Sequence, residues 1–365
     1  MFDKLDKAYC QLLGIFNPYQ ANPHRLDATF PRYDGPAFKK NPRHNFVYDK
    51  LFVAQSQNMR AGPLAELRPK NTPIEYPIFI KPRYGHMTAS SKYCYKIHCR
   101  EELEKHFDKP DMMWSEFVAA TEGMTDFAVV DGDIKWQLSY IYSDKQYGFA
   151  DVWKKVDPAT EPPAEIVEWV KKYLTGYTGP VNVQYRDVSI IEVGLRLARS
   201  GMYVESSGCK ALVDDLNTMW LTKAWPYRNP KEYEFEPFYS FKCWSPVPVL
   251  YLLPQHLVDL IVRKNGSMPF YEYYFEPTGT SSTVFFQFLH HDFDKGMQLK
   301  CMLEKTTLVF NVLIVAILVA GVLVAVFRKC FSVLFVAFFL YLTSFDNSLL
   351  IVANQFKNQK QFVGL

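Results

Sequence analysis

The sequence predicts an α+β protein that continues into a C-terminal transmembrane segment or hairpin. Short runs of β-forming residues and amphipathic helical patterns follow one another along most of the 365 residues. Residues 306–327 differ from the rest, because residues 308–327 carry no charge and Asn311 is their only strongly polar side chain. At about 1.5 Å per residue, roughly 20 residues cross the ~30 Å hydrocarbon core of a bilayer. We therefore expect a membrane span at 306–327.

The composition argues against two broad classes of protein. The 41 basic and 38 acidic residues leave a formal net charge of only +3, which does not suit a dedicated nucleic-acid binder. The seven cysteines show no CxxC spacing, which is typical of reduced thiols in the cytosol rather than of a disulfide framework. Residues 1–7 are charged and mixed, so we expect no signal peptide.

The distribution of these patterns predicts five segments. Residues 1–48 form a short N-terminal segment that is too small to be a large domain. The main α+β core follows at 49–225, and an aromatic-rich β lobe at 226–300 completes the folded part. A membrane anchor at 306–345 and a polar tail at 346–365 end the chain.

Local patterns predict the individual elements of these segments. Asp49 is expected to cap a helix, and the Asp/Gly-rich turn at 131–133 is expected to join the two strands of a hairpin. Further helices are predicted at 100–107, 162–174, 211–225 and 255–263, and strands at 77–82, 93–97, 112–118, 125–130, 134–142, 181–185 and 188–193.

A second apolar run, at 331–345, is short for a membrane span. We expect it either to cross back as the return arm of a hairpin or to lie at the interface. Lys357 and Lys360 favour a cytosolic C-terminus, whereas Arg328 and Lys329 favour the opposite orientation. The basic residues therefore leave the topology open.

The stretch Pro77-Ile-Phe-Ile-Lys-Pro82 has the pattern of a strand that ends in a lysine. A loop rich in glycine and hydroxyl residues follows at 83–92. Lys81 would supply a positive charge and the loop would supply backbone amides, which together suit a bound polyphosphate. An ordinary edge turn has the same pattern, so the stretch by itself leaves both interpretations open.

Two further stretches carry polar side chains near strand ends. Glu116, Val118 and Glu122 surround the end of one strand, where backbone groups can read an adenine edge and a carboxylate can accept from ribose hydroxyls. A solvated glutamate on a hairpin is the alternative. On the predicted pair of strands, Gln184 and Glu192 would meet as oxygen ligands of Mg²⁺. A glutamate in an apolar strand is costly to bury unless it is paired or ligated, although an exposed edge strand is the alternative here.

The order of these motifs resembles the ATP-grasp superfamily over about residues 49–205, and most closely its carbamoyl-phosphate-synthetase-like members. The resemblance implies an ATP-grasp fold, in which two α/β subdomains hold a nucleotide in the cleft between them. It also implies a role for each motif. Lys50 and Lys81 would be the two lysines that bind ATP, and residues 85–92, with Gly85 and Ser90, would form the phosphate loop. The adenine hinge would be Glu116 to Val118, and the carboxylate for the ribose would be Glu122. The metal ligands would be Gln184 and Glu192. Arg196 and Arg199 follow, where they could clamp phosphate or carboxylate oxygens.

The resemblance implies a ligase that depends on ATP and Mg²⁺, with Lys81 and Arg196 as catalytic residues. ATP would phosphorylate a carboxylate, and an amine, thiol or similar nucleophile would attack the acyl phosphate. The protein would be anchored in a membrane, with this part facing the cytosol.

Departures from the family pattern favour a second hypothesis. Gly194 stands where the family usually has the asparagine that completes the metal shell. Ser91 and Lys92 stand where the phosphate loop usually carries a glycine, and the region ahead of Lys50 is short. The alternative is therefore a catalytically degenerate nucleotide-binding or structural membrane protein that retains the ATP-grasp fold.

Overall fold

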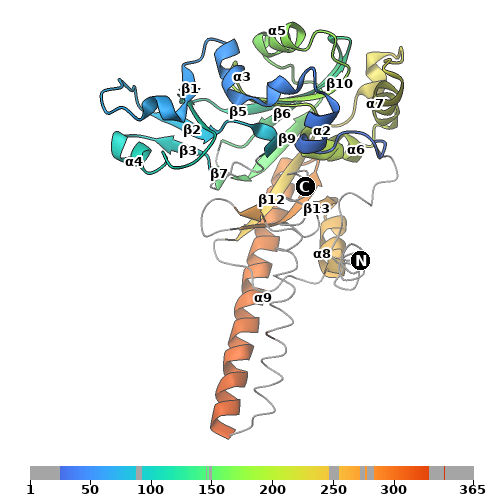
Figure 1. Cartoon of the computed structure of the whole chain (residues 1–365). Coiled ribbons are helices and arrows are strands. Elements are labelled where there is room, and N and C mark those ends of the chain that lie inside the picture. Colours follow the sequence, from blue (N-terminus) through green and yellow to red (C-terminus); the bar gives the residue numbers. More distant parts are fainter. Residues whose placement is uncertain are drawn as a thin grey trace. The chain divides into compact units, whose positions relative to one another are not determined.

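The computed structural model describes residues 25–87, 93–144, 146–147, 150–245, 255–271, 276–277, 283–328 and 341 (Figure 1). They belong to two compact units. The first, called the core unit, takes up Asn22–Asp144 and Lys155–Pro237. The second, called the α9 unit after its longest helix, takes up Lys145–Lys154 and Phe238–Asn358. The domain limits predicted from the sequence stay predictions.

The smaller sheet of the core unit has the strand order β1-β4-β2-β3, with every pair antiparallel. Ile78 and Ile80 point from β2 into a core that leucines from η2 and α4 complete, whereas Lys81 stands on the opposite face of the strand. The strands predicted at 77–82 and 112–118 are confirmed, and the helix predicted at 100–107 ends earlier. The elements are β1 (Ala61–Pro63), η2 (Leu64–Leu67), β2 (Ile78–Pro82), β3 (Tyr95–Ile97), α4 (Arg100–Glu104) and β4 (Met112–Glu116).

The larger sheet of the core unit runs in the order β11-β10-β5-β6-β9. β10 pairs antiparallel with both β5 and β11, and in the second pair Gln184 lies opposite Glu192. The strand pair predicted from 181–185 and 188–193 is therefore confirmed. The strands are β5 (Glu122–Val130), β6 (Asp133–Tyr142), β9 (Trp153–Asp157), where the chain enters this unit, β10 (Gly179–Arg186) and β11 (Ser189–Gly194).

The turn between β5 and β6 explains why this hairpin could be predicted. Asp131 and Gly132 have φ angles of 52° and 87°. Positive φ at both central residues defines a type I′ turn, whose twist matches that of the flanking strands. Asp-Gly adopts this conformation at low cost, so the dipeptide fixes where the two strands turn.

Helices cover one face of the larger sheet, and the other face carries a group of polar side chains near β11. The core under the helices includes Phe127, Val183 and Val193 from three neighbouring strands (Figure 1). Because side chains alternate along a strand, Asp126, Asn182, Gln184 and Glu192 face away from this core. The covering elements are α2 (Asp34–Lys40), η1 (Asn45–Tyr48), α3 (Lys50–Ser56) and α5 (Ala164–Tyr173). The unit also contains η3 (Gly85–Met87), η4 (Ala198–Gly201), α6 (Met202–Ser206), α7 (Lys210–Thr222) and η5 (Pro230–Tyr233).

The α9 unit is built on antiparallel strands in the order β12-β15-β13, with β14 also paired to β15. The first turns of α9 pack on this sheet through Leu299 and Leu303. A Cβ added at Gly296 would lie 2.2 Å from the ring of Phe241, so only glycine allows this close approach. The elements are β7 (Gln146–Tyr147), β8 (Ala150–Asp151), β12 (Phe238–Ser245), α8 (Gln255–Lys264), β13 (Met268–Tyr271), β14 (Glu276–Pro277), β15 (Thr283–His290) and α9 (Phe293–Arg328).

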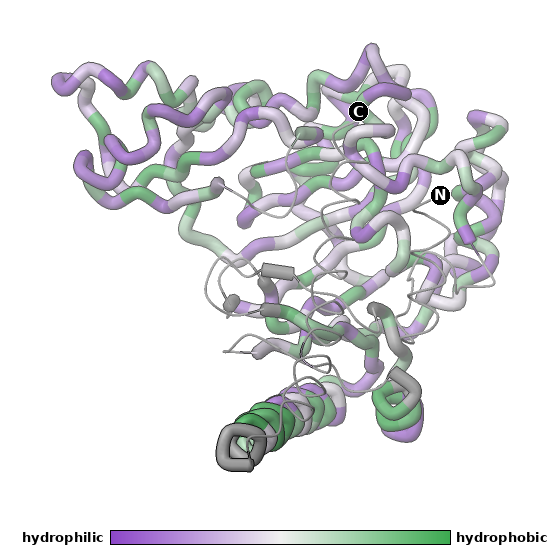
Figure 2. The backbone as a smooth tube through the Cα atoms, turned by 60° about the horizontal axis from the view of Figure 1, so that its bottom comes forward, coloured by the Kyte–Doolittle hydropathy of each residue, from purple (hydrophilic) through white to green (hydrophobic). Residues whose placement is uncertain are grey.

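Helix α9 contains the predicted membrane span but begins well before it. Its 36 residues start at Phe293, because the turns that pack on the sheet and the apolar stretch form one continuous helix. Leu313, Ile317 and Val319 are 55%, 65% and 53% exposed, unlike the side chains of a soluble core helix. Figure 2 shows the hydrophobic residues that dominate the distal part of this helix. In the described part of the chain, α9 is the one helix long and apolar enough to cross a membrane, which makes it a candidate membrane segment. Of the second predicted run, 331–345, only Tyr341 is among the described residues.

Candidate functional site

Lys50 reaches the candidate site from the first turn of α3. Asp49 caps this helix by accepting a hydrogen bond from the N–H of Leu51 at 3.0 Å, and Arg83 Nε donates to the same carboxylate at 2.8 Å. The Lys50 side chain is buried, and its Nζ lies 3.0 Å from Oε2 of Glu192. Burial lowers the pKa of Lys50, but the Glu192 carboxylate outweighs that effect and the pKa is raised. Burial likewise raises the pKa of Glu192, and Lys50 reverses this, so both groups are charged.

Lys81 approaches the same place from the smaller sheet. It is only 8% exposed, and its Nζ donates a hydrogen bond to the backbone oxygen of Ile191 at 2.7 Å. Within the ranges described above, no carboxylate forms an ion pair with this ammonium group. Burial, together with repulsion from Lys50, lowers the pKa of Lys81 to about 8. A buried positive charge without a carboxylate partner is a favourable position for an anion.

Gly85 lies against this pair of charges. A Cβ added at Gly85 would lie 3.2 Å from Oε1 of Glu192 and 3.3 Å from Cε of Lys50, so a larger residue would crowd both side chains. The structure thus brings together four of the residues singled out in the sequence, Lys50, Lys81, Gly85 and Glu192. Ser90, predicted in the same loop, lies outside the described residues.

Gln184 and Glu122 form a second part of the site. Gln184 lies opposite Glu192 in the β10–β11 ladder, and its Nε2 donates to Oε1 of Glu122. Arg186 Nη2 donates to the other oxygen of Glu122 at 3.1 Å. The side-chain oxygen of Gln184 accepts no hydrogen bond from a described residue, and therefore keeps its lone pairs for a ligand.

Glu116 and Val118 lie where β4 ends. The Glu116 carboxylate accepts hydrogen bonds from the backbone N–H and from Nε of Arg60, both at 3.1 Å, and its own N–H donates to the Arg60 oxygen at 2.9 Å. Val118 is half-buried in the irregular segment that follows the strand. Its N–H takes part in no hydrogen bond with the part of the chain that the structure describes, so a base edge could use it.

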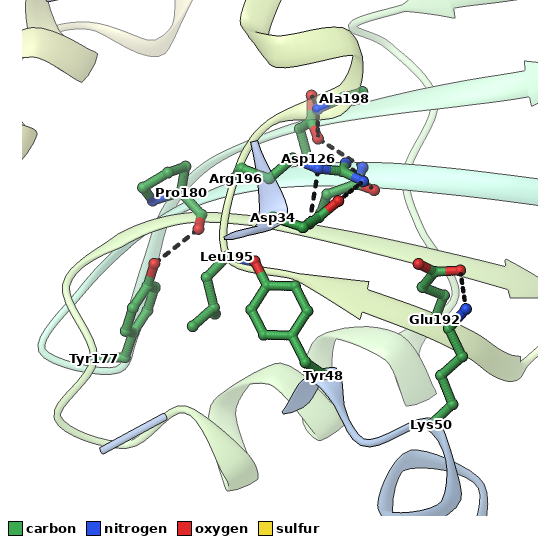
Figure 3. A network of polar contacts seen from close by, with 11 residues as sticks. Asp34, Tyr48, Lys50, Asp126, Tyr177, Pro180, Glu192, Leu195, Arg196 and Ala198 are labelled. Carbon is green, nitrogen blue, oxygen red and sulfur yellow. Dashed lines mark hydrogen bonds and ion pairs between the residues drawn. The ribbon is translucent and has the colours of Figure 1, made fainter. Parts of the chain in front are cut away.

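Arg196 belongs to a further group of polar contacts, which Figure 3 shows. Its Nε lies 3.1 Å from Oδ1 of Asp34, its Nη2 donates to Oδ2 of Asp34 at 3.1 Å, and its Nη1 donates to Oδ1 of Asn182 at 3.0 Å. Asn182 Nδ2 in turn donates to Asp126 at 2.8 Å. Burial raises the pKa of Asp126 to about 6, although donors that include Tyr140 act against this.

Sequence reasoning gave no role to Asp34, Asn182 or Asp126. Asp126 carries the signal that identified Glu192, an acid inside an apolar strand, and the same rule would have found it. Asn182 shares a strand face with Gln184 and could have been found from that alternation. Asp34 precedes Arg196 by 162 positions, and no local pattern points to their contact.

The donor set for a cation is small. Among the described residues, no group of three or more His, Cys, Asp or Glu side chains lies close enough together to hold a metal ion. Mg²⁺ usually takes one or two protein carboxylates and completes its shell with water and substrate phosphates. Glu192 and the amide oxygen of Gln184 fit that requirement as oxygen donors on facing strands.

The sequence matches no model of a known protein family and no curated protein. Several solved structures are similar. Carboxyaminoimidazole ribonucleotide synthase from Aspergillus clavatus, solved with ATP, has a TM-score of 0.52 and 12% identity over 73% of this chain and 74% of that chain. N5-carboxyaminoimidazole ribonucleotide synthetase from Thermus thermophilus has a TM-score of 0.48 and 11% identity, over 75% of this chain and 79% of that chain. L-amino acid ligase from Bacillus licheniformis has a TM-score of 0.42 and 15% identity, over 74% of this chain and 72% of that chain.

The first of these likenesses identifies the class of the fold. The core unit has two α/β parts, each with its own antiparallel sheet, and the chain has the ATP-grasp fold that the sequence predicted. Among these three structures, the synthase solved with ATP is the one whose TM-score exceeds 0.5. At 12% identity that likeness concerns the fold alone.

Proposed function

We propose that the core unit binds ATP with Mg²⁺ and uses it to activate a carboxylate for attack by an amine or a similar nucleophile. The observation that carries this proposal is the convergence of Lys50, Lys81 and Glu192 from two different sheets and one helix start. Lys81 is the central part of it, since a buried ammonium group without a carboxylate partner is destabilising unless an anion binds there.

The positions of the other residues support one orientation of the nucleotide. The phosphates would lie against Lys50, Lys81 and the backbone of Gly85. The adenine edge would meet the backbone at Glu116 and Val118. The ribose hydroxyls would meet Glu122, and the metal ion would meet Glu192 and Gln184.

The chemistry would need positioning and charge neutralisation more than a covalent nucleophile. A carboxylate oxygen of the acid would attack the γ-phosphorus of ATP, which would release ADP and form an acyl phosphate. The amine would then attack the acyl carbon, lose a proton and expel inorganic phosphate. Lys81 and Arg196 would offset the negative charge on the transferred group, and Mg²⁺, when bound, would neutralise the phosphates.

One observation favours a second candidate, a nucleotide-binding protein without turnover. Arg196 is engaged by Asp34 and Asn182, and Gly194 offers no side chain beside it. A protein with this arrangement could keep ATP binding through the lysines while lacking the arginine for the acid.

Membrane anchoring is the remaining part of the proposal. The exposed apolar side chains of α9, such as Leu313 and Ile317, support insertion into a bilayer. Because ATP and reduced thiols are cytosolic, we place the core unit on the cytosolic side.

The full-length protein in detergent provides the test. With ATP and Mg²⁺ at 100 times the Kd, binding should raise the unfolding free energy by about 2.7 kcal/mol, which a thermal shift would detect. ADP release with a panel of carboxylates and amines then separates ligase from binding protein. Absence of any ATP-dependent shift would eliminate both candidates.

A further inference from the structure

Gly194 and Asp34 share one small volume. A Cβ added at Gly194 would lie 2.8 Å from Oδ1 of Asp34, closer than real Cβ atoms approach an oxygen. The other nearby atoms belong to Arg196, at the ordinary distance of 3.6 Å. The carboxylate of Asp34, from the first turn of α2, therefore stands where a side chain of residue 194 would be.

The two oxygens of Asp34 differ in their surroundings. Oδ2 accepts the hydrogen bond from Arg196 Nη2 at 3.1 Å. Oδ1 is buried and lies 3.1 Å from Arg196 Nε, but it accepts no hydrogen bond from any described residue. A carboxylate has about four acceptor positions, so Oδ1 keeps lone pairs for another partner.

Oδ1 of Asp34 lies beside position 194, which is on the same strand as Glu192. Residues 192 and 194 are two apart on β11, and Gln184 faces Glu192 from β10, so all three positions share one face of the sheet. On the basis of the proposed function, we propose that Asp34 supplies to the nucleotide-bound Mg²⁺ the side-chain oxygen that Gly194 cannot. Gly194 is a glycine because Asp34 takes its place.

The charges of the site give the expected effect a direction. Lys50, Lys81 and Arg196 carry three positive charges, and Asp34 and Glu192 carry two negative ones. Without Asp34 the site is more positive, which favours ATP alone and disfavours a divalent cation. Loss of Asp34 therefore weakens MgATP binding while leaving metal-free ATP binding unchanged or stronger.

The test measures the Kd of ATP by calorimetry in Mg²⁺ and in EDTA, using the full-length protein in detergent. We expect Asp34→Asn to lower the ratio of the two constants, EDTA over Mg²⁺, about tenfold. The double variant Asp34→Ala/Gly194→Asn, which returns an oxygen to the same place, should recover most of that ratio. Its matched control is Asp34→Ala alone, which should not.

A second measurement needs no nucleotide. Gly194→Ala should lower the melting temperature of the wild type and change it little in the Asp34→Ala background, because the two side chains compete for one volume. Equal effects in both backgrounds would refute the shared volume.

The possible failures are distinguishable. If Asp34→Asn weakens ATP binding equally in Mg²⁺ and EDTA, Asp34 only positions Arg196 and the metal proposal is wrong. An unchanged ratio also overturns it, as does a wild type that binds ATP equally with and without Mg²⁺. A wild type that binds no ATP overturns the proposed function as well.

Discussion

Replacing Lys81 with methionine is expected to raise stability and to weaken ATP binding. The pKa of this buried lysine is about 8 instead of the ordinary 10.5. At about 1.4 kcal/mol for each pH unit, that difference means that the charged form destabilises the folded state by about 3 kcal/mol at pH 7. Loss of the hydrogen bond to Ile191 offsets about 1 kcal/mol. Lys81→Met should therefore gain about 2 kcal/mol in unfolding free energy without nucleotide.

The effect on binding has the opposite sign. A charge-assisted hydrogen bond from Lys81 to a phosphate contributes about 1.5–3 kcal/mol, so the Kd for ATP should rise about 10- to 100-fold. Calorimetry gives the Kd and thermal unfolding gives the stability. Lys171→Met, on the exposed face of α5, is the matched control and should change neither quantity.

The pH dependence adds a third criterion. Because the pKa of Lys81 is lower in the folded than in the unfolded state, the destabilisation is fully present below pH 8 and disappears as the pH rises to 10.5. Over that interval the wild type should gain stability relative to Lys81→Met. A variant that is less stable than the wild type and binds ATP equally well would refute both the cost of burial and the assignment of the site.

Three further predictions test other parts of the structure. Glu192→Gln leaves Lys50 buried without its partner and should lower the unfolding free energy by about 3 kcal/mol, as measured by chemical denaturation. Burial raises the pKa of Asp126 to about 6, above the 3.8 of the unfolded state. The stabilisation from the protonated carboxyl is therefore fully present below pH 3.8 and is lost as the pH rises through 6. From pH 4 to pH 7, the unfolding free energy of the wild type should fall relative to that of Asp126→Asn. Leu313→Lys/Ile317→Lys places two charges in α9 at about 2.5–3.5 kcal/mol each and should release the chain from membranes in an extraction assay, whereas Lys305→Arg should not.

Local signals were sufficient for much of the fold. The Asp131-Gly132 dipeptide located a type I′ turn, and Asp49 located the start of α3 through its capping bond. The start of α9 could not be found in this way. Hydropathy marks where a helix becomes apolar at residue 306, whereas Phe293 begins the helix because its first turns pack on β12.

The part of the candidate site that depends on strand register could be predicted from the sequence. Gln184 and Glu192 were expected to face each other, and they do, because antiparallel pairing sets which side chains are opposite. The ion pair of Lys50 with Glu192 joins two predicted residues, but nothing in the sequence indicated that the partner of each would be the other. The role of Asp34 could not be predicted from the sequence, because its contact with Arg196 depends on how α2 packs against the sheet.

Binding and turnover depend on different residues, and this separates the two proposed functions. Lys81 is buried without a carboxylate partner and is destabilising in the absence of an anion, which argues that the core unit keeps it for a ligand. Arg196 has Asp34 and Asn182 as its partners, whereas Lys50 pairs with Glu192 and Lys81 donates to the Ile191 oxygen. Arg196→Lys should therefore leave the Kd of ATP within about twofold, because the point charge remains, while removing the planar fork that carboxylate and phosphoryl oxygens require. Arg228→Lys, an arginine paired with Asp215 in the same unit, is the control. If Arg196→Lys abolishes ADP release that the wild type and the control both show, the protein is a ligase. If ATP affinity falls instead by as much as in Lys81→Met, Arg196 contacts the nucleotide, and binding and turnover share this residue.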